Sequence, residues 1–254
     1  MMASPRKKQL EELLGPGFVC FGHRGMRELV PENTLKAFQL GLQSTRYFEL
    51  DTMLTKDEVL VVIHDETLNR TTNGEGLVRE KTFEEIQTLD AGSYFSPKFA
   101  GTKVPSLESL FYELPVSTIF DIEVKSNEDE NERKLLAKHL VTLLSRCKAN
   151  HRVFITSFDP FLLEAVKREN PALLRGQLLE EGDSLKQDFV SEPDLFLPNY
   201  KGLTKDTMIE LSSMSYSVIP YTMNDPKDWE RMLPWGLRGL ITDRPDLFLN
   251  FRKA

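Results

Sequence analysis

The chain has 254 residues, of which 40% are hydrophobic and 28% are charged, a composition that supports one large domain with a sizeable core. Its formal net charge of -7 argues against nucleic acid and anionic membranes as partners. Because there are two cysteines, no apolar signal segment in residues 1–17 and no apolar run long enough to span a bilayer, we expect a cytoplasmic protein without stable membrane insertion.

The first core strand is predicted over 18–22, where a nearly unbroken apolar run is typical of a strand buried on both faces. It ends in Gly22-His23-Arg24-Gly25, so a histidine and an arginine are exposed where the chain leaves the strand. A helix then opens after Pro31-Glu32, with Asn33 or Thr34 as its N-cap.

A β-hairpin is predicted next, because two strand-like runs, 47–54 and 59–63, flank a turn-forming segment. Glu49 and Asp51 are two residues apart, so their carboxylates leave the same face of the strand. Folding the hairpin about its turn brings His64 back roughly opposite Asp51. Two acids and an imidazole therefore converge from one short stretch, which indicates a site for chemistry.

Residues 66–105 are too long a connection to be a structureless loop in a compact domain, so we expect a small inserted subdomain there. Its aromatic residues Tyr94, Phe95 and Phe99 have two readings. They can form the insertion's own small core, which we favour, or an apolar wall beside the reacting centre.

The third core strand is predicted over 118–125, where Asp121, Glu123 and Lys125 share one face by the period of two. Three ionisable groups on one face of an otherwise apolar strand need partners or a metal, because an unpaired buried charge is costly. This strand is therefore a second source of polar side chains for the same site.

Eight core strands are predicted, each followed by a helix or an insertion: 18–22, 46–52, 118–125, 152–157, 174–179, 195–198, 217–222 and 239–243. The alternating helices are expected over 9–14, after 34, near 82–85, and over 106–112, 131–147, 161–169, 184–189, 205–214, 226–232 and 246–251. This alternation indicates an α/β fold, a (β/α)8 TIM barrel with a small insertion after strand 2, rather than an open doubly wound sheet. We treat 1–254 as a single barrel domain, with 66–105 as a subdomain inserted within it.

Active sites of such barrels lie at the carboxyl ends of the strands, so His23, Glu49, Asp51 and Glu123 are expected to cluster at one mouth. Three carboxylates without a cysteine ligand favour one hard divalent cation, Mg2+ or Ca2+, over zinc. The sequence therefore predicts a divalent metal site formed by the three acids.

An ordinary ion-pair network is the alternative, with the three acids neutralised by Arg24, Lys125 and Arg46. The metal site is favoured because two of the chain's four histidines, His23 and His64, are also predicted at this rim. The other two, His139 and His151, are expected to be structural.

The reaction class follows from the remaining polar groups. Arg24, Lys125 and a cation form a positive patch suited to a phosphate, and His23 and His64 can serve as general base and general acid near neutral pH. Metal-assisted phosphoryl transfer is therefore predicted. The chain has neither a Walker-type loop nor Gly-x-Gly-x-x-Gly for a nucleotide, and it lacks the His-x-His pair of another metal-hydrolase type.

The polar motifs, taken together and in order from about residue 18 to 248, resemble the glycerophosphodiester phosphodiesterase family. They are His23-Arg24-Gly25, Pro31-Glu32-Asn33-Thr34, Glu49-x-Asp51, His64-Asp65, Leu68-x-Arg70-Thr71-Thr72, Glu123-x-Lys125 and Ile241-Thr242-Asp243. The resemblance implies a (β/α)8 barrel with a small insertion after strand 2. It also implies metal-dependent cleavage of a small-molecule glycerophosphodiester to glycerol 3-phosphate and an alcohol.

By the same resemblance, one Mg2+ or Ca2+ ion, with Mn2+ as a further option, would be held by Glu49, Asp51 and Glu123. His23 would be the base and His64 the acid, and the glycerol 2-hydroxyl would attack the phosphorus to give a cyclic phosphate that water opens. The phosphate would contact Arg24 and Lys125. Tyr221 stands where many relatives have a tryptophan, and it would form a wall against glycerol or the leaving group.

Two rival functions remain open at this point. A lysophospholipase D-like hydrolase acting on lysolipids would need an exposed apolar rim for an acyl chain, which the sequence does not reveal. A non-catalytic binding or scaffold barrel would be expected to have lost one or more site residues, and every one is present. The residues leave open the head group, the particular metal and the oligomeric state.

Overall fold

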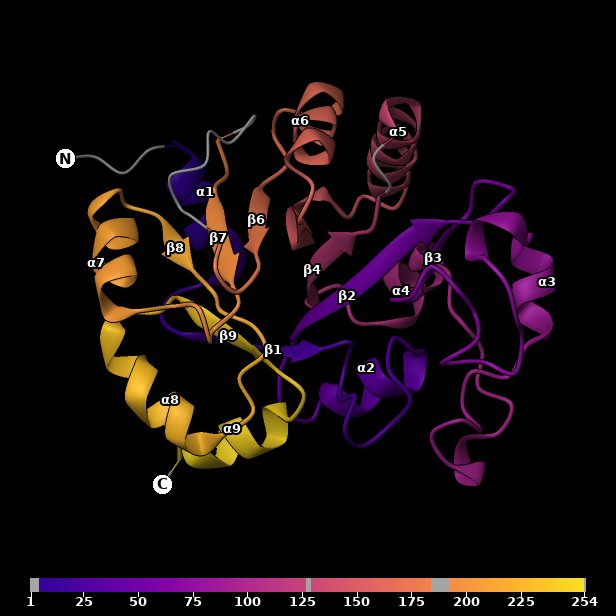
Figure 1. Cartoon of the computed structure of the whole chain (residues 1–254), viewed down its shortest axis with the longest axis horizontal. Helices are drawn as coiled ribbons and strands as arrows, with labels where there is room; N and C mark the ends of the chain where they lie inside the picture. The colour runs from indigo at the N-terminus through magenta and orange to yellow at the C-terminus, as the bar shows by residue number, and fades with distance from the viewer. Residues whose placement is uncertain (1–4, 127–128, 184–191, 254) are drawn as a thin grey trace.

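Parallel strands surrounded by helices form a barrel in the computed structural model, which describes residues 5–126, 129–183 and 192–253 (Figure 1). Its strands are β1 (Val19–His23), β2 (Tyr47–Leu54), β3 (Leu60–Val62), β4 (Ile119–Val124), β5 (Val153–Ser157), β6 (Arg175–Leu179), β7 (Leu195–Pro198), β8 (Ser217–Val218) and β9 (Gly239–Thr242). The order around the barrel is β8-β7-β6-β5-β4-β2-β1-β9, with β3 paired only to β2. Neighbours on this path are parallel, which confirms the predicted (β/α)8 topology.

The barrel is closed between its last two strands by backbone hydrogen bonds outside the regular ladders. The N–H groups of Arg238 and Ile241 donate to the carbonyls of Val218 and Pro220, at 2.9 and 3.0 Å, and the N–H of Met223 donates to Ile241 at 2.9 Å. The strand predicted over 217–222 is regular only at β8. One physical reason is Pro220, which has no N–H to give to a ladder.

The helices alternate with the strands as predicted: α1 (Pro5–Leu14), α2 (Leu35–Gly41), α3 (Phe83–Thr88), α4 (Leu107–Glu113), α5 (Glu130–Arg146), α6 (Pro160–Glu169), α7 (Lys205–Ser213), α8 (Pro226–Met232) and α9 (Pro245–Phe251). Thr34 is the N-cap of α2, and Thr82 and Glu85 form the capping box of α3. The first helix begins earlier than the predicted 9–14, at Pro5. The helix predicted over 184–189 lies outside the described residues.

The predicted hairpin is present as β2 and β3, with Thr52 opposite Val62 and Leu54 opposite Leu60. In Figure 1 it leads from the barrel towards α3. The buried side chains of the segment over 66–105 pack against the hairpin, forming one cluster of Met53, Val61, Ile63, Leu68, Val78, Ile86, Ala91 and Val104. Because this cluster is shared with β2 and β3, the bounds of a separate subdomain stay a prediction.

The aromatic residues of this segment contact one another, and the apolar wall considered for them stays a prediction. The ring of Phe95 contacts the rings of Tyr94 and Phe99, as expected for a small core of their own. The hydroxyl of Tyr94, however, accepts a hydrogen bond from the N–H of Glu32 at 3.2 Å. The segment therefore also contacts the loop that leaves β1.

The amino-terminal end of the barrel is covered by α1, whose contacts reach three of the strands. Arg6 donates to the carbonyls of Ala172 and Leu173, just before β6, and it pairs with Asp194, just before β7, at 3.1 Å. At the other end of the helix, the hydroxyl of Tyr47 on β2 donates to the carbonyl of Leu14. Apolar residues of α1 form one core with apolar residues in or next to the strands, and it continues from this end into the barrel: Leu10, Leu13, Leu14, Val19, Phe21, Ile119, Phe154, Leu174, Leu178, Leu195, Leu197, Ile219 and Ile241.

A second core lies between the strands and the outer helices. Phe120 on β4 contacts Phe38 of α2 and Phe111 of α4, with ring centroids 6.2 and 5.8 Å apart. β4 is also paired in parallel with β2, and both strands contribute to the site described below. None of the described helices is long and apolar enough to cross a bilayer.

Candidate active site

The turn after β1 is held in a conformation that places Arg24 over the neighbouring strand. Arg24 has φ of 50° and Gly25 has φ of 90°, and a Cβ at Gly25 would lie 2.5 Å from the Cβ of Ala37, so only glycine fits there. The backbone N–H of Arg24 donates to Glu49 Oε2 at 3.0 Å. The left-handed backbone of a non-glycine residue is thus used to bind an acid of the site.

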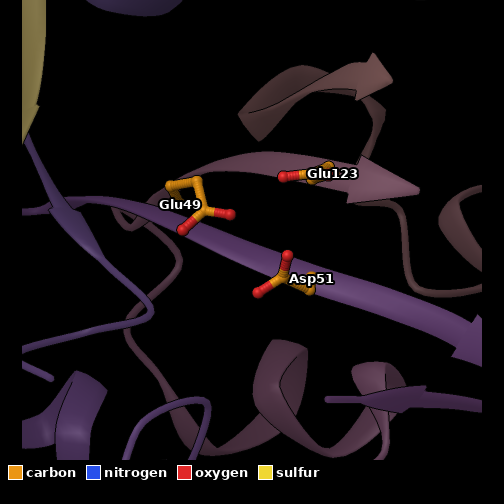
Figure 2. Close-up of side chains that lie close together, drawn as sticks. All are labelled: Glu49, Asp51 and Glu123. Carbon is orange, nitrogen blue, oxygen red and sulfur yellow. The ribbon is translucent and has the colours of Figure 1, made fainter. Parts of the chain in front are cut away.

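Strand register brings the three predicted acids together. His23 on β1 pairs with Glu49 on β2, and Asp51 on β2 pairs with Glu123 on β4. One carboxylate oxygen from each acid lies within 4.8 Å of the others, and all three side chains are buried. Figure 2 shows their oxygens facing a common space between the two strands. The acids therefore form one cluster that could hold a metal ion.

The three carboxyl groups differ strongly in their preferred charge. Burial, together with the charge of Asp51, raises the pKa of Glu49, and it raises the pKa of Glu123 to about 7. Burial also acts against ionisation of Asp51, but the charges of Arg24 and Lys125 hold its pKa well below its usual range. The cluster thus has more carboxyl groups than nearby positive charge can compensate.

One oxygen of Glu49 indicates that a cation fits this cluster. Its Oε1 atom is buried and has no hydrogen-bond partner within the described residues. A buried carboxylate oxygen without a partner is costly, and a hard divalent cation with oxygen ligands would satisfy it. The donor set, three carboxylates with no sulfur or imidazole among them, fits such a cation.

The predicted basic residues also lie at the cluster, with one exception. Arg24 Nε lies 3.0 Å from Asp51 Oδ2, and Lys125 Nζ lies 3.1 Å from Asp51 Oδ1 and also contacts Glu123. Arg46, the third cation of the ion-pair alternative, is not there. Its guanidinium donates to the hydroxyl of Tyr47 at 3.0 Å, at the start of β2, because residue 46 precedes the strand and the two acids of β2 lie further along it.

His23 is buried beside the cluster and is fixed by a carboxylate of its own. Its Nδ1 lies 2.6 Å from Asp243 Oδ1, and its Nε2 lies 3.8 Å from Glu49 Oε2. Asn224 Nδ2 donates to the second oxygen of Asp243 at 2.7 Å. Burial lowers the pKa of His23 despite the hydrogen bond that its Nδ1–H donates to Asp243, so the ring is neutral near pH 7 with Nε2 available to accept a proton.

His64 reaches the cluster from the return strand of the hairpin. The N–H of Ile63 donates to the carbonyl of Asp51, which sets the position of the next residue. His64 Nδ1 lies 2.6 Å from Asp65 Oδ1, and a third of the His64 side chain is exposed. Burial lowers the pKa of His64, against the charge of Asp51, which raises it.

Tyr221 lies at the carboxyl end of the barrel beside Phe158 and not within the acidic cluster. Its hydroxyl donates to the carbonyl of Leu179 at 2.9 Å, and its ring centroid lies 6.1 Å from that of Phe158. Lys125 Nζ lies 5.9 Å from the Phe158 ring. The two rings therefore form an apolar side of the mouth next to Lys125.

Sequence reasoning gave no role in the site itself to several residues that hold it together, although most of them lie in the motifs quoted above. These are Asp65 and Asp243, which bind the two imidazoles, Asn224, which binds Asp243, Asn33, whose side chain donates to Asp51 at 2.8 Å, and Glu32 and Arg70, which bind each other. Their positions in the sequence could have identified the two aspartates. Each of the two aspartates directly follows a predicted site residue or a strand end.

The parallel barrel and a polar cluster at the carboxyl ends of its strands define an enzyme of the (β/α)8 class. The sequence model of the Glycerophosphoryl diester phosphodiesterase family matches residues 23–247. The chain belongs to this family and is an enzyme, a phosphoric diester hydrolase. The resemblance noted in its motifs is confirmed.

Two similar proteins are both called glycerophosphodiester phosphodiesterase. The protein of Caldanaerobacter subterraneus subsp. tengcongensis is 36% identical over 91% of this chain and 96% of its own length. The protein of Bacillus subtilis is 35% identical over 95% of this chain and 89% of its own length. Both alignments therefore span the barrel and its insertion.

Solved structures show the same fold. The crystal structure of a putative glycerophosphoryl diester phosphodiesterase from Silicibacter pomeroyi superposes with a TM-score of 0.83 at 27% identity, covering 97% of this chain and 98% of that one. A phosphodiesterase from Oleispira antarctica, in complex with the product sn-glycerol-3-phosphate, gives a TM-score of 0.86, covering 94% and 98%. At 23% identity, the second likeness concerns the fold alone.

Proposed function

We propose that this enzyme hydrolyses glycerophosphodiesters to glycerol 3-phosphate and an alcohol, and that it requires a divalent cation. The observation that carries the proposal is the convergence of three buried carboxylates within 4.8 Å with two imidazoles, each held by its own aspartate. Membership of the family, and the names of the similar proteins, supply the substrate class.

Glu49, Asp51 and Glu123 would hold the cation, and Mg2+ or Ca2+ suits an all-oxygen donor set best, with Mn2+ as a further option. A bound cation supplies positive charge that stabilises the phosphoryl oxygens in the transition state. Arg24 and Lys125, already anchored on Asp51, place two more positive groups at the same rim and would contact the phosphate.

The two histidines would move the protons. His23 Nε2 accepts the proton of the glycerol 2-hydroxyl as its oxygen bonds to phosphorus. His64 would act as the imidazolium, with its Nδ1–H on Asp65, and would give its Nε2 proton to the alcohol oxygen as the bond between that oxygen and phosphorus breaks. The hydroxyl and the phosphorus belong to one molecule, so the attack benefits from a high effective concentration. Water then opens the cyclic phosphate, with the two imidazoles exchanging roles.

The apolar side of the mouth would orient the rest of the substrate. Phe158, next to Lys125, and Tyr221, against Phe158, present ring surface that a group bonded to the phosphate would contact. We assign Tyr221 to contact with glycerol or with the leaving alcohol.

A second candidate substrate is a lysolipid, hydrolysed by a lysophospholipase D-like reaction at the same site. The observation that favours it is exposed aromatic surface after β5, where Phe158 is 37% and Phe161 is 55% exposed. An acyl chain could lie on such a surface. A small glycerophosphodiester remains the preferred substrate, because it can reach the three acids without an apolar channel for an acyl chain.

Release of glycerol 3-phosphate from several glycerophosphodiesters, with lysophosphatidylcholine assayed in parallel, tests the proposal. We expect turnover that a chelator abolishes and that added Mg2+ or Ca2+ restores, and we expect His64→Ala to fold normally with a kcat lowered by at least about 10²-fold. Turnover that survives chelation, or full activity of His64→Ala, would rule out the mechanism. Turnover of the lysolipid alone would establish the second candidate.

A further inference from the structure

One arginine at the mouth binds two carboxylates at once, and neither belongs to the acidic cluster. Arg70 Nε and Nη2 donate to the two oxygens of Asp65 at 2.7 and 2.9 Å. Its Nη1 and Nη2 donate to the two oxygens of Glu32 at 2.9 and 2.8 Å. The planar guanidinium therefore makes a bidentate contact on each side, which fixes both carboxylates relative to each other.

The first of these carboxylates, Asp65, binds the imidazole of His64. Asp65 Oδ1 accepts from His64 Nδ1 at 2.6 Å, and Arg70 binds both oxygens of the same carboxylate. The hydrogen bonds from Arg70 are the main cause of the low pKa of Asp65. Arg70 thus keeps Asp65 charged and in place, which holds the Nδ1–H of His64, favours the protonated ring and fixes its direction.

The second carboxylate, Glu32, binds Arg24, the residue that follows β1. Glu32 Oε1 accepts from Arg24 Nη1 at 2.8 Å, while Arg24 Nε lies against Asp51. Glu32 is buried, which would raise its pKa, but the hydrogen bonds from Arg70 and the charge of Arg24 lower it to about 2. Glu32 is therefore ionised and holds Arg24 through a different nitrogen from the one that lies against Asp51.

Arg70 itself comes from the start of the segment over 66–105 and sits on a rigid turn. The N–H and the hydroxyl of Thr72 both bond the carbonyl of Leu68, at 3.1 and 2.6 Å, and Leu68 is buried in the insertion's core. The same segment supplies the Tyr94 hydroxyl that accepts the N–H of Glu32. The inserted segment thus contacts Glu32 through two residues.

We propose that Arg70 is a positioning residue that couples the placement of His64, through Asp65, to the placement of Arg24, through Glu32. It contacts no reacting atom in this scheme. The inference rests on the proposed function, in which His64 protonates the leaving alcohol and Arg24 contacts the phosphate. It makes the Leu68-x-Arg70-Thr71-Thr72 motif the part of the insertion that aligns the acid with the phosphate.

The two branches predict different kinetic effects, and four variants separate them. Asp65→Asn should lower kcat with little change in KM, and Glu32→Gln should raise KM with a smaller effect on kcat. Arg70→Ala should do both and lower kcat/KM by about 10²-fold. Arg70→Lys keeps the charge but not the fork, and should recover less than about tenfold of that loss.

Double variants give the decisive comparison, because coupled residues are not additive. With Asp65→Asn already present, Arg70→Ala should change kcat by less than about threefold and still raise KM. With Glu32→Gln already present, Arg70→Ala should still lower kcat and should leave KM nearly unchanged. Arg146→Ala, which removes an exposed ion pair with Glu108 on α4, is the matched control and should behave as the wild type.

Several outcomes would overturn the inference. Arg70→Ala with kcat/KM within twofold of the wild type would do so, as would double variants whose effects on kcat and KM simply add. If Arg70→Ala does not fold, Arg70→Lys with full kcat and KM would overturn it equally. A wild-type enzyme that turns over no glycerophosphodiester would instead be a failure of the proposed function, so the two failures are distinguishable.

Discussion

The imidazole of His23 is fixed by a residue 220 positions away in the chain, because Asp243 follows β9 and β9 pairs with β1. Asn224 contributes to the same arrangement, since its side chain donates to one oxygen of Asp243 and accepts the Asp243 N–H at 2.9 Å. The direction of His23 Nε2, the proton acceptor in the proposed mechanism, is thus set by contacts on the other side of the ring.

Asp243→Asn should lower kcat by about 10²-fold or more, since an amide cannot supply the charged acceptor that orients His23. Steady-state kinetics with a thermal melt of each variant would measure this. Asp246→Asn is the control, because Asp246 pairs only with Arg244 at the start of α9 among the contacts described for it. Equal losses in the two variants would contradict the assignment.

Glu49→Gln should separate metal binding from stability. Burial already favours the neutral form of Glu49, so the metal-free free energy of unfolding should change by less than about 1 kcal/mol. A cation present at 100 times its Kd should stabilise the wild type by about 2.7 kcal/mol and this variant hardly at all. Urea unfolding with and without Mg2+ or Ca2+ would measure both quantities.

The control for that measurement is Asp121→Asn. Asp121 is also buried on β4, burial raises its pKa, and it accepts from the hydroxyl of Thr156 at 2.6 Å, but it is not one of the three clustered acids. It should keep the metal-dependent stabilisation. Stabilisation that persists in Glu49→Gln would show that the cation binds elsewhere.

For individual residues, the sequence predicted which polar side chains of the site meet but not how they are paired. Glu49 and Asp51 share a face by the period of two, and Asp51 and Glu123 meet because their strands are neighbours, so local pattern and topology were sufficient. The pairing of His23 with Asp243 requires barrel closure to be known in three dimensions. Arg46 was misplaced because its position along β2 decides which end of the barrel it reaches.

Among the elements, the loop over 91–102 depends on one carboxylate. Asp90 accepts from the backbone N–H groups of Gly92, Ser93 and Gly101 at 2.7 to 2.8 Å. These hydrogen bonds, led by the one from Gly101, hold the pKa of Asp90 well below its usual range. The loop carries Tyr94, so its order bears on the contact with Glu32.

Acid should therefore loosen this loop before it unfolds the barrel. A carboxyl group whose pKa is lower in the folded state stabilises that state above its unfolded pKa of about 3.9, and the contribution is lost as pH falls below that value. Amide hydrogen exchange at Gly92, Ser93 and Gly101 should accelerate in this range relative to amides of β4. Asp90→Asn should show faster exchange already at neutral pH, and equal exchange in both proteins would contradict the prediction.

Most elements could be predicted because their patterns are local. Buried parallel strands appear as apolar runs, and Thr82 with Glu85 announces the start of α3. The irregular end of the strand predicted over 217–222 was not foreseen, although Pro220 lies in its middle. The boundary of the insertion is also hard to predict, because its core includes residues of β2 and β3.

The whole molecule depends on α1 at the amino-terminal end of the barrel. Leu14→Ala should lower the free energy of unfolding by about 2–5 kcal/mol, because Leu14 is fully buried among the residues that fill that end. The kcat/KM should be unchanged at temperatures where the variant is folded, since the site lies at the other end. Leu247→Ala, at a partly exposed position, should change stability by less than about 0.5 kcal/mol.

Because α1 and the apolar filling seal one end of the barrel, the site has the geometry of a cup and not of a tunnel. Substrate would arrive, and glycerol 3-phosphate and the alcohol would depart, through the same rim. An occupant of that rim blocks the next arrival, so either product at high concentration should compete with substrate. Dissociation, rather than bond breaking, would then limit the rate whenever a product leaves the rim more slowly than the phosphate ester bond breaks.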